Sequence, residues 1–273
     1  MAHCIVSAAE EILDKEFPVL DKGFVRLVDY LGSDARIVQS ARVSYGEGTK
    51  TYRQDKALIA YLMRNEHTSP FEQVIFTFHI KMPIFVARQW IRHRTARVNE
   101  ISGRYSIMAD EAYVPDFEHI NYQSEDNKQG RSDEPVGEDV CRQVAELIQS
   151  NHEHAFTSYK KLLDLGIARE LARIDLPLSL YTQWYWQMDL HNLFHFLKLR
   201  LDAHAQYEIR VYAEQILSIV ETVCPMACEA FRSIELEGKR FTAREVEALK
   251  ALIAHQDNPL TGRELELFEE KLK

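Results

Sequence analysis

The chain has 273 residues and carries 33 lysines and arginines against 42 aspartates and glutamates, a formal charge of −9 with neutral histidines. This acidic balance argues against a general nucleic-acid binder, because such binding depends on an excess of cations. At 46% hydrophobic and 27% charged residues, the composition is globular and excludes disordered and fibrous classes. No linker compels two domains, so we expect a single domain over residues 1–273.

Four cysteines are too few for a disulfide scaffold, so buried thiols are expected at Cys4, Cys141, Cys224 and Cys228. Glu10 and Glu11 interrupt the N-terminal segment before an apolar run develops, and no later stretch is long and uncharged enough to cross a bilayer. The sequence therefore predicts a soluble, cytoplasmic protein.

The first third of the chain alternates between strand and helix patterns. Residues 23–31 predict a strand, and Ser33 or Asp34 is placed to cap a helix over 35–43. A second helix is expected over 52–64. Apolar side chains recur at every second position from residue 72 to 82, which predicts a strand with one buried face. Pro83 suits the first turn of a helix over 84–94.

The polar segment 116–138 predicts a mobile loop or insertion, and a long helix over 139–165 is expected to end at Gly166. Further predicted elements are helices over 168–174, 190–201 and 203–223 and a strand over 178–188. The C-terminal extension, about 225–273, is predicted to be helical, with two capping boxes at Thr242/Glu245 and Thr261/Glu264. Strands mixed irregularly with helices favour an α+β fold.

Arginines gather between Arg88 and Arg104, where five of them and His93 occupy seventeen positions of an acidic chain. Arg88 and Arg92 are expected on one helix face, and Ser102 and Gly103 follow in a loop that can present backbone N–H groups to a phosphate. Forked guanidinium groups bind phosphate bidentately.

A solvated basic face paired with carboxylates is the alternative explanation for such a charge run. The apolar residues interleaved with the arginines favour partial burial instead: Trp90, Ile91, Val98 and Ile101. A buried arginine needs a partner, which a ligand phosphate or the carboxylate of Glu100 can supply.

A metal site must be considered because two pairs of possible ligands lie one helical turn apart. These pairs are His191 with His195 and His204 with Glu208. The carboxylate and Glu-x-x-His pattern of a di-metal helical site and the His-Glu-x-x-His pattern of a zinc protease are both missing, so no metal is expected. The glycines form neither a dinucleotide fingerprint nor a Walker loop, and no Gly-x-Ser-x-Gly elbow makes Ser102 a nucleophile.

The segment RHRTARVNEISGRYS, with Arg92-His93-Arg94 seven positions before Ser102, resembles the long signature of the flavin-dependent thymidylate synthases, the ThyX family. The resemblance extends through SARVSYGEG and EHTSPFEQVIFTFHIKMPIFVARQW upstream and ARIDLPLSLYT and HNLFHFLKLRLDAHAQYEIR downstream, or about residues 40–212. The Pro-Cys-His setting of conventional thymidylate synthases is not found in the sequence.

This resemblance implies an α+β subunit with a central, mostly antiparallel sheet, flanking helices and a helical C-terminal half, assembled as a homotetramer with shared active sites. It implies reductive methylation of dUMP to dTMP, with methylenetetrahydrofolate as carbon donor, reducing equivalents from NADPH through FAD, and no enzyme nucleophile.

The same resemblance assigns roles to individual residues. Arg200 is expected to activate the uracil ring, and His67 to support the flavin chemistry. Cofactor contacts are expected from Ser69, Arg92, His93, Arg94, Glu100, Asp189, His191 and His195. Substrate contacts are expected from Gln89, Arg92, Glu100, Ile101, Ser102, Gly103, Arg104, Arg173 and Arg200.

Arg97 departs from the family pattern, which commonly has serine there. It could add a phosphate or pyrophosphate contact or pair with an acidic neighbour, and pairing is the favoured interpretation. Two other classes remain as alternatives. A nucleotide-binding regulatory protein would bind dUMP without flavin reduction, and a helical metal protein would hold metal through His191, His195, His204 and Glu208.

Overall fold

A computed structural model describes residues 5–43, 52–125, 128 and 130–273. Cys4 and most of the SARVSYGEG segment lie outside these described residues. Two units are distinguished along the chain, Met1–Ala230 and Phe231–Lys273. The number of domains expected from the sequence remains a prediction.

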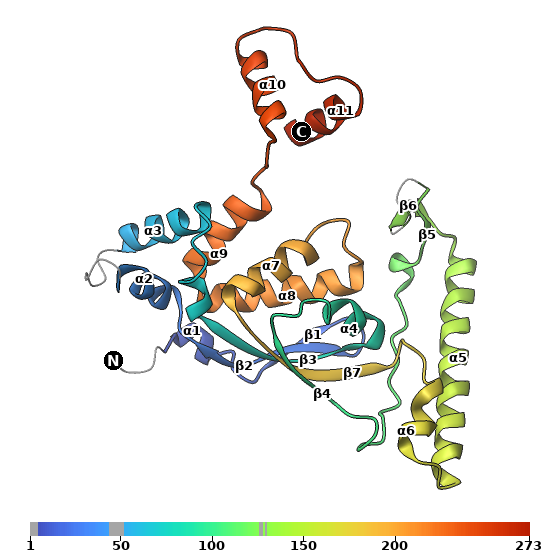
Figure 1. The fold of residues 1–273 in the computed structure, drawn as a ribbon. Helices are drawn as coiled ribbons and strands as arrows, with labels where there is room; N and C mark the ends of the chain where they lie inside the picture. The colour runs from blue at the N-terminus through green and yellow to red at the C-terminus, as the bar shows by residue number, and fades with distance from the viewer. Residues whose placement is uncertain (1–4, 44–51, 126–127, 129) are drawn as a thin grey trace. The chain divides into compact units, whose positions relative to one another are not determined.

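The strands of the first unit form an antiparallel sheet (Figure 1). In the described part of the chain it has five strands in the order β1-β2-β3-β7-β4, namely β1 (Glu16–Val19), β2 (Gly23–Leu31), β3 (Ile75–Pro83), β7 (Tyr181–Asp189) and β4 (Arg97–Glu100). Every neighbouring pair is antiparallel. The α+β architecture with an antiparallel sheet is therefore confirmed.

One face of β3 supplies the centre of the core, as the alternation predicts. Phe76, Phe78, Ile80 and Met82 are fully buried, whereas the residues between them are half-buried. In register with Phe78 on the neighbouring strand lies Trp186. Burying side chains of this size contributes roughly 1.5–3 kcal/mol each, so this strand anchors the sheet.

The first unit also contains helices and short 3₁₀ turns, with α7 and α8 lying along one side of the sheet (Figure 1). The α-helices are α1 (Ser7–Glu10), α2 (Asp34–Arg42), α3 (Tyr52–Arg64), α4 (Ile84–Trp90), α5 (Glu138–Asp164), α6 (Arg169–Ala172), α7 (Leu190–Arg200), α8 (Tyr207–Val223) and α9 (Pro225–Phe231). The 3₁₀ turns are η2 (Phe71–Gln73), η3 (Phe117–His119) and η4 (Arg173–Asp175). Gly166, with φ +77°, follows α5 as expected.

Trp90, the last residue of α4, joins these helices to the sheet. Its ring stacks on Phe196 of α7 with centroids 4.8 Å apart and meets Trp184 and Trp186 of β7 edge-on. Tyr212 of α8 completes the cluster, with its ring 5.8 Å from Trp90. This aromatic packing fixes the end of α4, from which the arginine-rich segment begins.

Several predicted boundaries are corrected by the structure. The predicted strand over 72–82 begins only at Ile75, because residues 71–73 form η2. The helix predicted over 84–94 ends at Trp90, and α8 begins at Tyr207 rather than at residue 203. Strands β1 and β4 were not predicted.

The polar segment 116–138 carries more structure than the expected loop. It contains η3 and a hairpin of β5 (Asn121–Gln123) with β6 (Arg131–Pro135). Arg131 reaches out of this hairpin, donating from Nη1 to the backbone carbonyl of His119 and from Nη2 to the carboxylate of Glu208 on α8. These hydrogen bonds tie the hairpin to neighbouring segments.

Ser33 occupies the N-cap of α2, as expected, but its side chain makes no capping hydrogen bond. The carboxylate of Asp34 accepts instead from the backbone N–H groups of Met226 and Ala227, at 2.8 and 3.0 Å, in the first turn of α9. Burial raises the pKa of Asp34 to about 6 against the effect of those two hydrogen bonds. Asp34 thus caps a helix distant in sequence.

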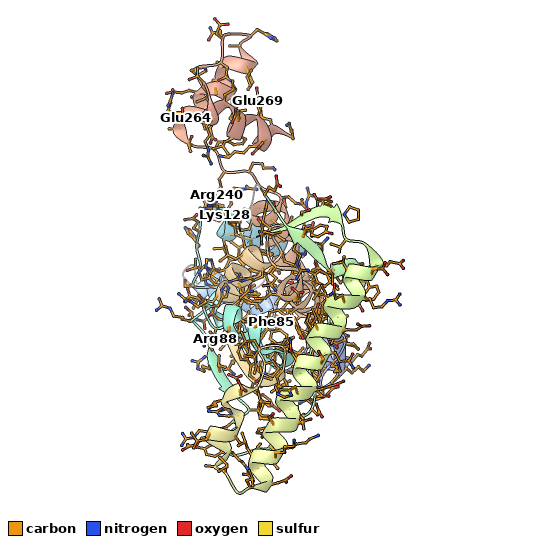
Figure 2. All side chains as sticks on the ribbon, turned by 90° about the vertical axis from the view of Figure 1, so that its right-hand side faces the viewer. Phe85, Arg88, Lys128, Arg240, Glu264 and Glu269 are labelled. Atoms are coloured by element: carbon orange, nitrogen blue, oxygen red, sulfur yellow. The ribbon has the colours of Figure 1, made fainter. Side chains whose placement is uncertain are left out.

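The second unit contains η5 (Arg232–Leu236), a π-helical turn, and helices α10 (Ala243–Ile253) and α11 (Arg263–Leu272). The first predicted capping box is confirmed, since Thr242 caps α10 reciprocally with Glu245. The second is wrong: α11 begins after Gly262 at φ +56° without a side-chain cap. Glu264 pairs instead with Arg244 at 2.6 Å and is labelled in Figure 2.

Cys141, Cys224 and Cys228 are buried, as predicted. Across the described ranges, the structure contains no helix with both the length and the apolar character needed to cross a membrane.

Candidate active site

Arg200, the last residue of α7, is held by His93, which follows α4. Arg200 Nε donates to His93 Nε2 across 3.0 Å. A ring nitrogen that accepts carries no proton, so His93 is neutral with its proton on Nδ1. Burial, together with the charges of Arg200 and His195, lowers the pKa of His93 to about 4. Burial also lowers the pKa of Arg200, and the guanidinium remains charged.

The ring of His93 is fixed from two further sides. His195 of α7 lies with its ring centroid 6.1 Å from that of His93, and Phe196 packs edge-on at 4.9 Å. His195 is exposed, whereas Phe196 is fully buried. The structure therefore brings together three of the predicted site residues at the boundary between core and solvent.

A second group forms where the chain turns after β4. The carbonyl oxygen of Ser102 accepts from the N–H groups of Tyr105 and Ser106, and Ser102 Oγ accepts from the N–H of Arg104 at 3.2 Å. Gly103 lies inside this turn. These bonds hold residues 102–106 in one tight conformation.

Arg173 of η4 lies directly over Gly103. A Cβ on Gly103 would lie 2.9 Å from Arg173 Cδ and 3.1 Å from Met108 Sδ, so these side chains would have to shift to make room for it. The missing side chain at Gly103 therefore leaves room for the arginine to lie close to the backbone. Arg104 pairs with Glu170 of α6 at 3.0 Å, so three predicted nucleotide-binding residues share this turn.

Glu100, at the end of β4, faces β7. Thr182 Oγ1 donates to Glu100 Oε1 at 2.6 Å, and the N–H of Ile101 donates to the carbonyl of Gln183 at 2.9 Å. Thr182 was not predicted as a site residue, because a strand interior gives no signal for such a role. Pairing with β7 thus places Glu100 and Ile101 immediately before the Ser102 turn.

The arginines do not show the expected partial burial within this single chain. Arg88, Arg92, Arg94, Arg97 and Arg104 are all exposed. Because α4 ends at Trp90, Arg92 lies beyond the helix and does not share a helix face with Arg88. Arg88 lies to the left of Phe85 in Figure 2.

The predicted partner of Arg97 is also corrected. Arg97 Nη1 donates to Gln187 Oε1 at 3.4 Å, an amide rather than a carboxylate. Of the residues interleaved with the arginines, Trp90 is fully buried, but Ile91 and Val98 are 40% and 38% exposed. This segment therefore offers cationic and apolar side chains together at the surface.

Gln89 is half-buried in the last turn of α4 and bonds to another amide. Its Nε2 donates to Gln206 Oε1, and Gln206 Nε2 donates to Glu208 Oε2 at 2.8 Å. Glu208 is 2% exposed and also receives hydrogen bonds from Arg131. The sequence gives no sign of these contacts, because Gln89 and Gln206 are 117 residues apart.

His67 and Ser69 lie in the loop between α3 and η2, both exposed. The ring of His67 meets Tyr61 edge-on at 5.9 Å. In the described part of the chain, no hydrogen bond or ring contact joins either residue to Arg200 or His93. This loop is a separate group of predicted residues.

Asp189 and His191 begin α7. Asp189 is its N-cap: Oδ1 accepts from the N–H of Asn192 at 2.9 Å, and Oδ2 accepts from Asn192 Nδ2 at 2.8 Å. The carboxylate thus has a structural partner that the sequence analysis missed. His191 is half-buried.

The residues considered for a metal site are not arranged as ligands. His204 lies before α8, is 83% exposed and contacts Asp202, whereas Glu208 is paired with Arg131. Over the residues that the structure covers, no group of three or more histidine, cysteine, aspartate or glutamate side chains could hold a metal ion.

Comparisons with known proteins agree with these observations. A family described as "Thymidylate synthase complementing protein" matches residues 26–226, and one described as "Thymidylate synthase ThyX C-terminal domain" matches residues 240–273. A protein of Treponema denticola named flavin-dependent thymidylate synthase is 66% identical, over 96% of this chain and 98% of its own length. A protein of Treponema pallidum with the same name is 57% identical, over 100% of this chain and 90% of its own length.

Solved structures show the same fold. The UMP/dUMP methylase PolB from Streptomyces cacaoi, bound with 5-Br dUMP, superposes with a TM-score of 0.73 at 35% identity, covering 81% of this chain and 99% of that one. Its complex with 5-Br UMP gives a TM-score of 0.72 at 35% identity, covering 80% of this chain and 97% of that one. By family match, sequence identity and fold, this chain belongs to the flavin-dependent thymidylate synthase family.

Proposed function

We propose that this protein is a thymidylate synthase that methylates dUMP to dTMP, taking the carbon from methylenetetrahydrofolate and reducing equivalents from NADPH through FAD. The observation that carries the proposal is the charged Arg200 held by neutral His93. The names of the relatives and the dUMP analogue bound by the Streptomyces methylase support it.

The dUMP phosphate is assigned to the turn at Ser102, Gly103 and Arg104. Arg173 lies against Gly103, so a phosphate at this turn would meet a guanidinium as well as the Ser102 hydroxyl. Charge-assisted hydrogen bonds of this kind contribute roughly 1.5–3 kcal/mol each. Arg104 already has Glu170 as a partner, and a phosphate would compete with that carboxylate.

Arg200 is assigned to the uracil ring. Its Nε is engaged by His93, which fixes the plane of the guanidinium and directs its remaining donors elsewhere. A guanidinium placed at a uracil carbonyl stabilises the negative charge of the N3-deprotonated ring, which makes C5 a better nucleophile. One well-placed donor of this kind is worth about 3–4 kcal/mol. No enzyme nucleophile is then needed.

The side chains present suit FAD, which supplies hydride-transfer chemistry when bound. Arg92 and Arg94 are exposed guanidinium groups that fit a pyrophosphate. His93 and His195 offer imidazole edges to a planar ring system, and His67 and Ser69 would contribute from their own loop.

Glu100 is oriented by Thr182 and can accept from a ligand hydroxyl. Asp189 and His191 keep cofactor contact as a proposed role, with Asp189 also holding α7.

We also assign the protein to the cytoplasm as a homotetramer whose active sites combine residues of several chains. Arginines that are exposed in the single chain, beside the exposed Ile91 and Val98, support such sharing.

An anaerobic flavin assay tests the proposed function. The purified protein is mixed with FAD, reduced with NADPH and then given methylenetetrahydrofolate with or without dUMP. We expect bleaching of the bound flavin by NADPH and recovery of its absorbance only when dUMP and the folate are both present. Protein that binds dUMP but no flavin would contradict the proposal and favour a nucleotide-binding regulatory protein.

A further inference from the structure

Glu208, in the first turn of α8, is a buried carboxylate with an unusually full set of donors. It accepts from Arg131 Nη2 at 2.6 and 2.8 Å, from Tyr113 Oη at 3.2 Å and from Gln206 Nε2 at 2.8 Å. Burial alone would raise its pKa, but the hydrogen bonds and charge of Arg131, with the Gln206 amide, hold the pKa below the ordinary value. Glu208 is therefore ionised at neutral pH.

A buried ion pair is weak grounds for a purely stabilising role, because desolvation offsets its attraction. The segments that meet at Glu208 are the β5–β6 hairpin, the residues before β5 and the start of α8. Through Gln206 they also reach Gln89 at the end of α4, next to the arginine-rich segment. The network thus ends at a residue of the candidate site.

The ionised carboxylate of Glu208 fixes the direction of both hydrogen bonds that lead from it through Gln206 to Gln89. A carboxylate only accepts, so Gln206 must turn its NH₂ toward Glu208 and its carbonyl oxygen toward Gln89. Gln89 must then turn its own NH₂ toward Gln206. The oxygen and nitrogen of an amide have nearly the same shape, so packing alone would not choose between the two orientations.

We propose that Glu208 is a positioning residue which, through Gln206, makes Gln89 present its carbonyl oxygen to a hydrogen-bond donor of the nucleotide. This inference rests on the proposed function, because the family resemblance that underlies it implies a dUMP contact for Gln89. The donors that dUMP carries are the sugar 3′-hydroxyl and, until the ring is deprotonated beside Arg200, the ring N3–H. Gln89 thereby discriminates a donor from an acceptor at that point of the ligand.

Two single variants break the relay at different points. Glu208→Gln allows the new amide to donate to Gln206, so both amides can reverse. Gln206→Leu leaves the Glu208–Arg131 pair in place and removes the orienting partner of Gln89. In either variant we expect the Kd and KM for dUMP to rise about tenfold, the effect of one hydrogen bond, with kcat changed by less than about twofold.

The double variant Gln206→Glu/Glu208→Gln provides the rescue. A glutamate at position 206 can only accept a hydrogen bond, so the NH₂ group of Gln89 must again face residue 206. We expect the Kd for dUMP to return to within about threefold of the unaltered protein. Glu214→Gln, an exposed position on the same helix, is the matched control and should bind dUMP normally.

Equilibrium dialysis with the full chain measures the Kd for dUMP of each variant. The melting temperature of each variant shows whether it is folded. Folded single variants that bind dUMP with the Kd of the unaltered protein would overturn the inference. A double variant that binds dUMP no more tightly than Glu208→Gln would also overturn it. Failure of the unaltered protein to bind dUMP would instead refute the proposed function. The same measurement with 2′,3′-dideoxyUMP identifies the donor. If the single variants bind this nucleotide as tightly as the unaltered protein does, Gln89 contacts the 3′-hydroxyl. If their Kd is still raised, Gln89 contacts N3–H.

Discussion

Arg200 owes its fixed position to a histidine that does not titrate in the neutral range. Because His93 accepts through Nε2, the pair requires a neutral imidazole, and the low pKa of about 4 preserves that state. Protonated His93 would place two cations 3.0 Å apart. The charge that this pair presents to a ligand therefore comes from the arginine and not from the histidine.

Removing Arg200 tests its assignment to the uracil ring. We expect Arg200→Ala to lower dTMP formation by about two to three orders of magnitude, because one preorganised donor to the developing charge is lost. FAD binding should survive, as measured by the absorbance of protein-bound flavin. Arg142→Ala, exposed on α5, is the control and should keep its turnover. Unchanged dTMP formation in Arg200→Ala would remove the arginine from the mechanism.

The low pKa of His93 predicts a pH dependence of stability. Between pH of about 4 and the unfolded value of about 6.5, the unfolded chain binds a proton that the folded chain does not. The contribution of His93 to the free energy of unfolding is therefore fully present above about pH 6.5 and is lost as the pH falls toward 4. His93→Gln can accept from Arg200 but cannot titrate in this range. The melting temperature of the unaltered protein, relative to His93→Gln, should rise from pH 4 to 6.5. A constant difference would contradict the assigned neutral histidine.

Several individual roles could be predicted only in part from the sequence. Arg200, His93 and Gly103 were identified through a family signature, and the structure explains how each is placed. Glu208 could have been found from its position on the apolar side of α8, since it precedes buried Ile209 and lies four residues before buried Tyr212. Its partner Arg131 could not, because the pairing spans 77 residues.

At the level of elements, tertiary contacts decide where local patterns stop. The helix pattern over 84–94 ends at Trp90, whose ring is held among Trp184, Trp186 and Phe196. Strand β4 is polar and exposed, so its sequence carries no alternation, and it becomes a strand only by pairing with β7. Long alternating or amphipathic segments such as β3 and α5 were predicted well because their own periodicity specifies them.

The two capping boxes provide a matched test of local rules. Thr242→Ala removes a cap that is formed, so exchange of the amide protons of α10 should accelerate about fivefold. Thr261→Ala removes no cap, because α11 begins after Gly262, and exchange in α11 should be unchanged. Hydrogen exchange of the full chain measures both. Equal acceleration in the two variants would show that both boxes form in solution.

At the scale of the whole molecule, the residues assigned to the active site all precede residue 201, within the first unit. The second unit has an apolar cluster of its own, centred on buried Ala248, Leu260 and Phe268. Helices could be predicted there from the sequence but a separate core could not, because three buried positions spread over 21 residues leave little periodicity to detect.

Phe268→Ala should open the second unit without unfolding the first. Emptying a fully buried phenylalanine site costs about 3–5 kcal/mol, which is large for so small a core. Amide exchange should accelerate in α10 and α11 and remain slow in β3 and α8. The neighbouring Leu267→Ala, 47% exposed, is the control. Loss of protection in β3 would show that the two units unfold together.

A single turnover with methylenetetrahydrofolate labelled in its transferred carbon tests the proposed methylation of dUMP most directly. FAD-loaded protein is reduced anaerobically with NADPH, given dUMP and the labelled folate, and the nucleotides are separated. We expect labelled dTMP from the complete mixture and none when dUMP, folate or reductant is omitted. Flavin that is reduced and reoxidised while all the dUMP is recovered unchanged would contradict it.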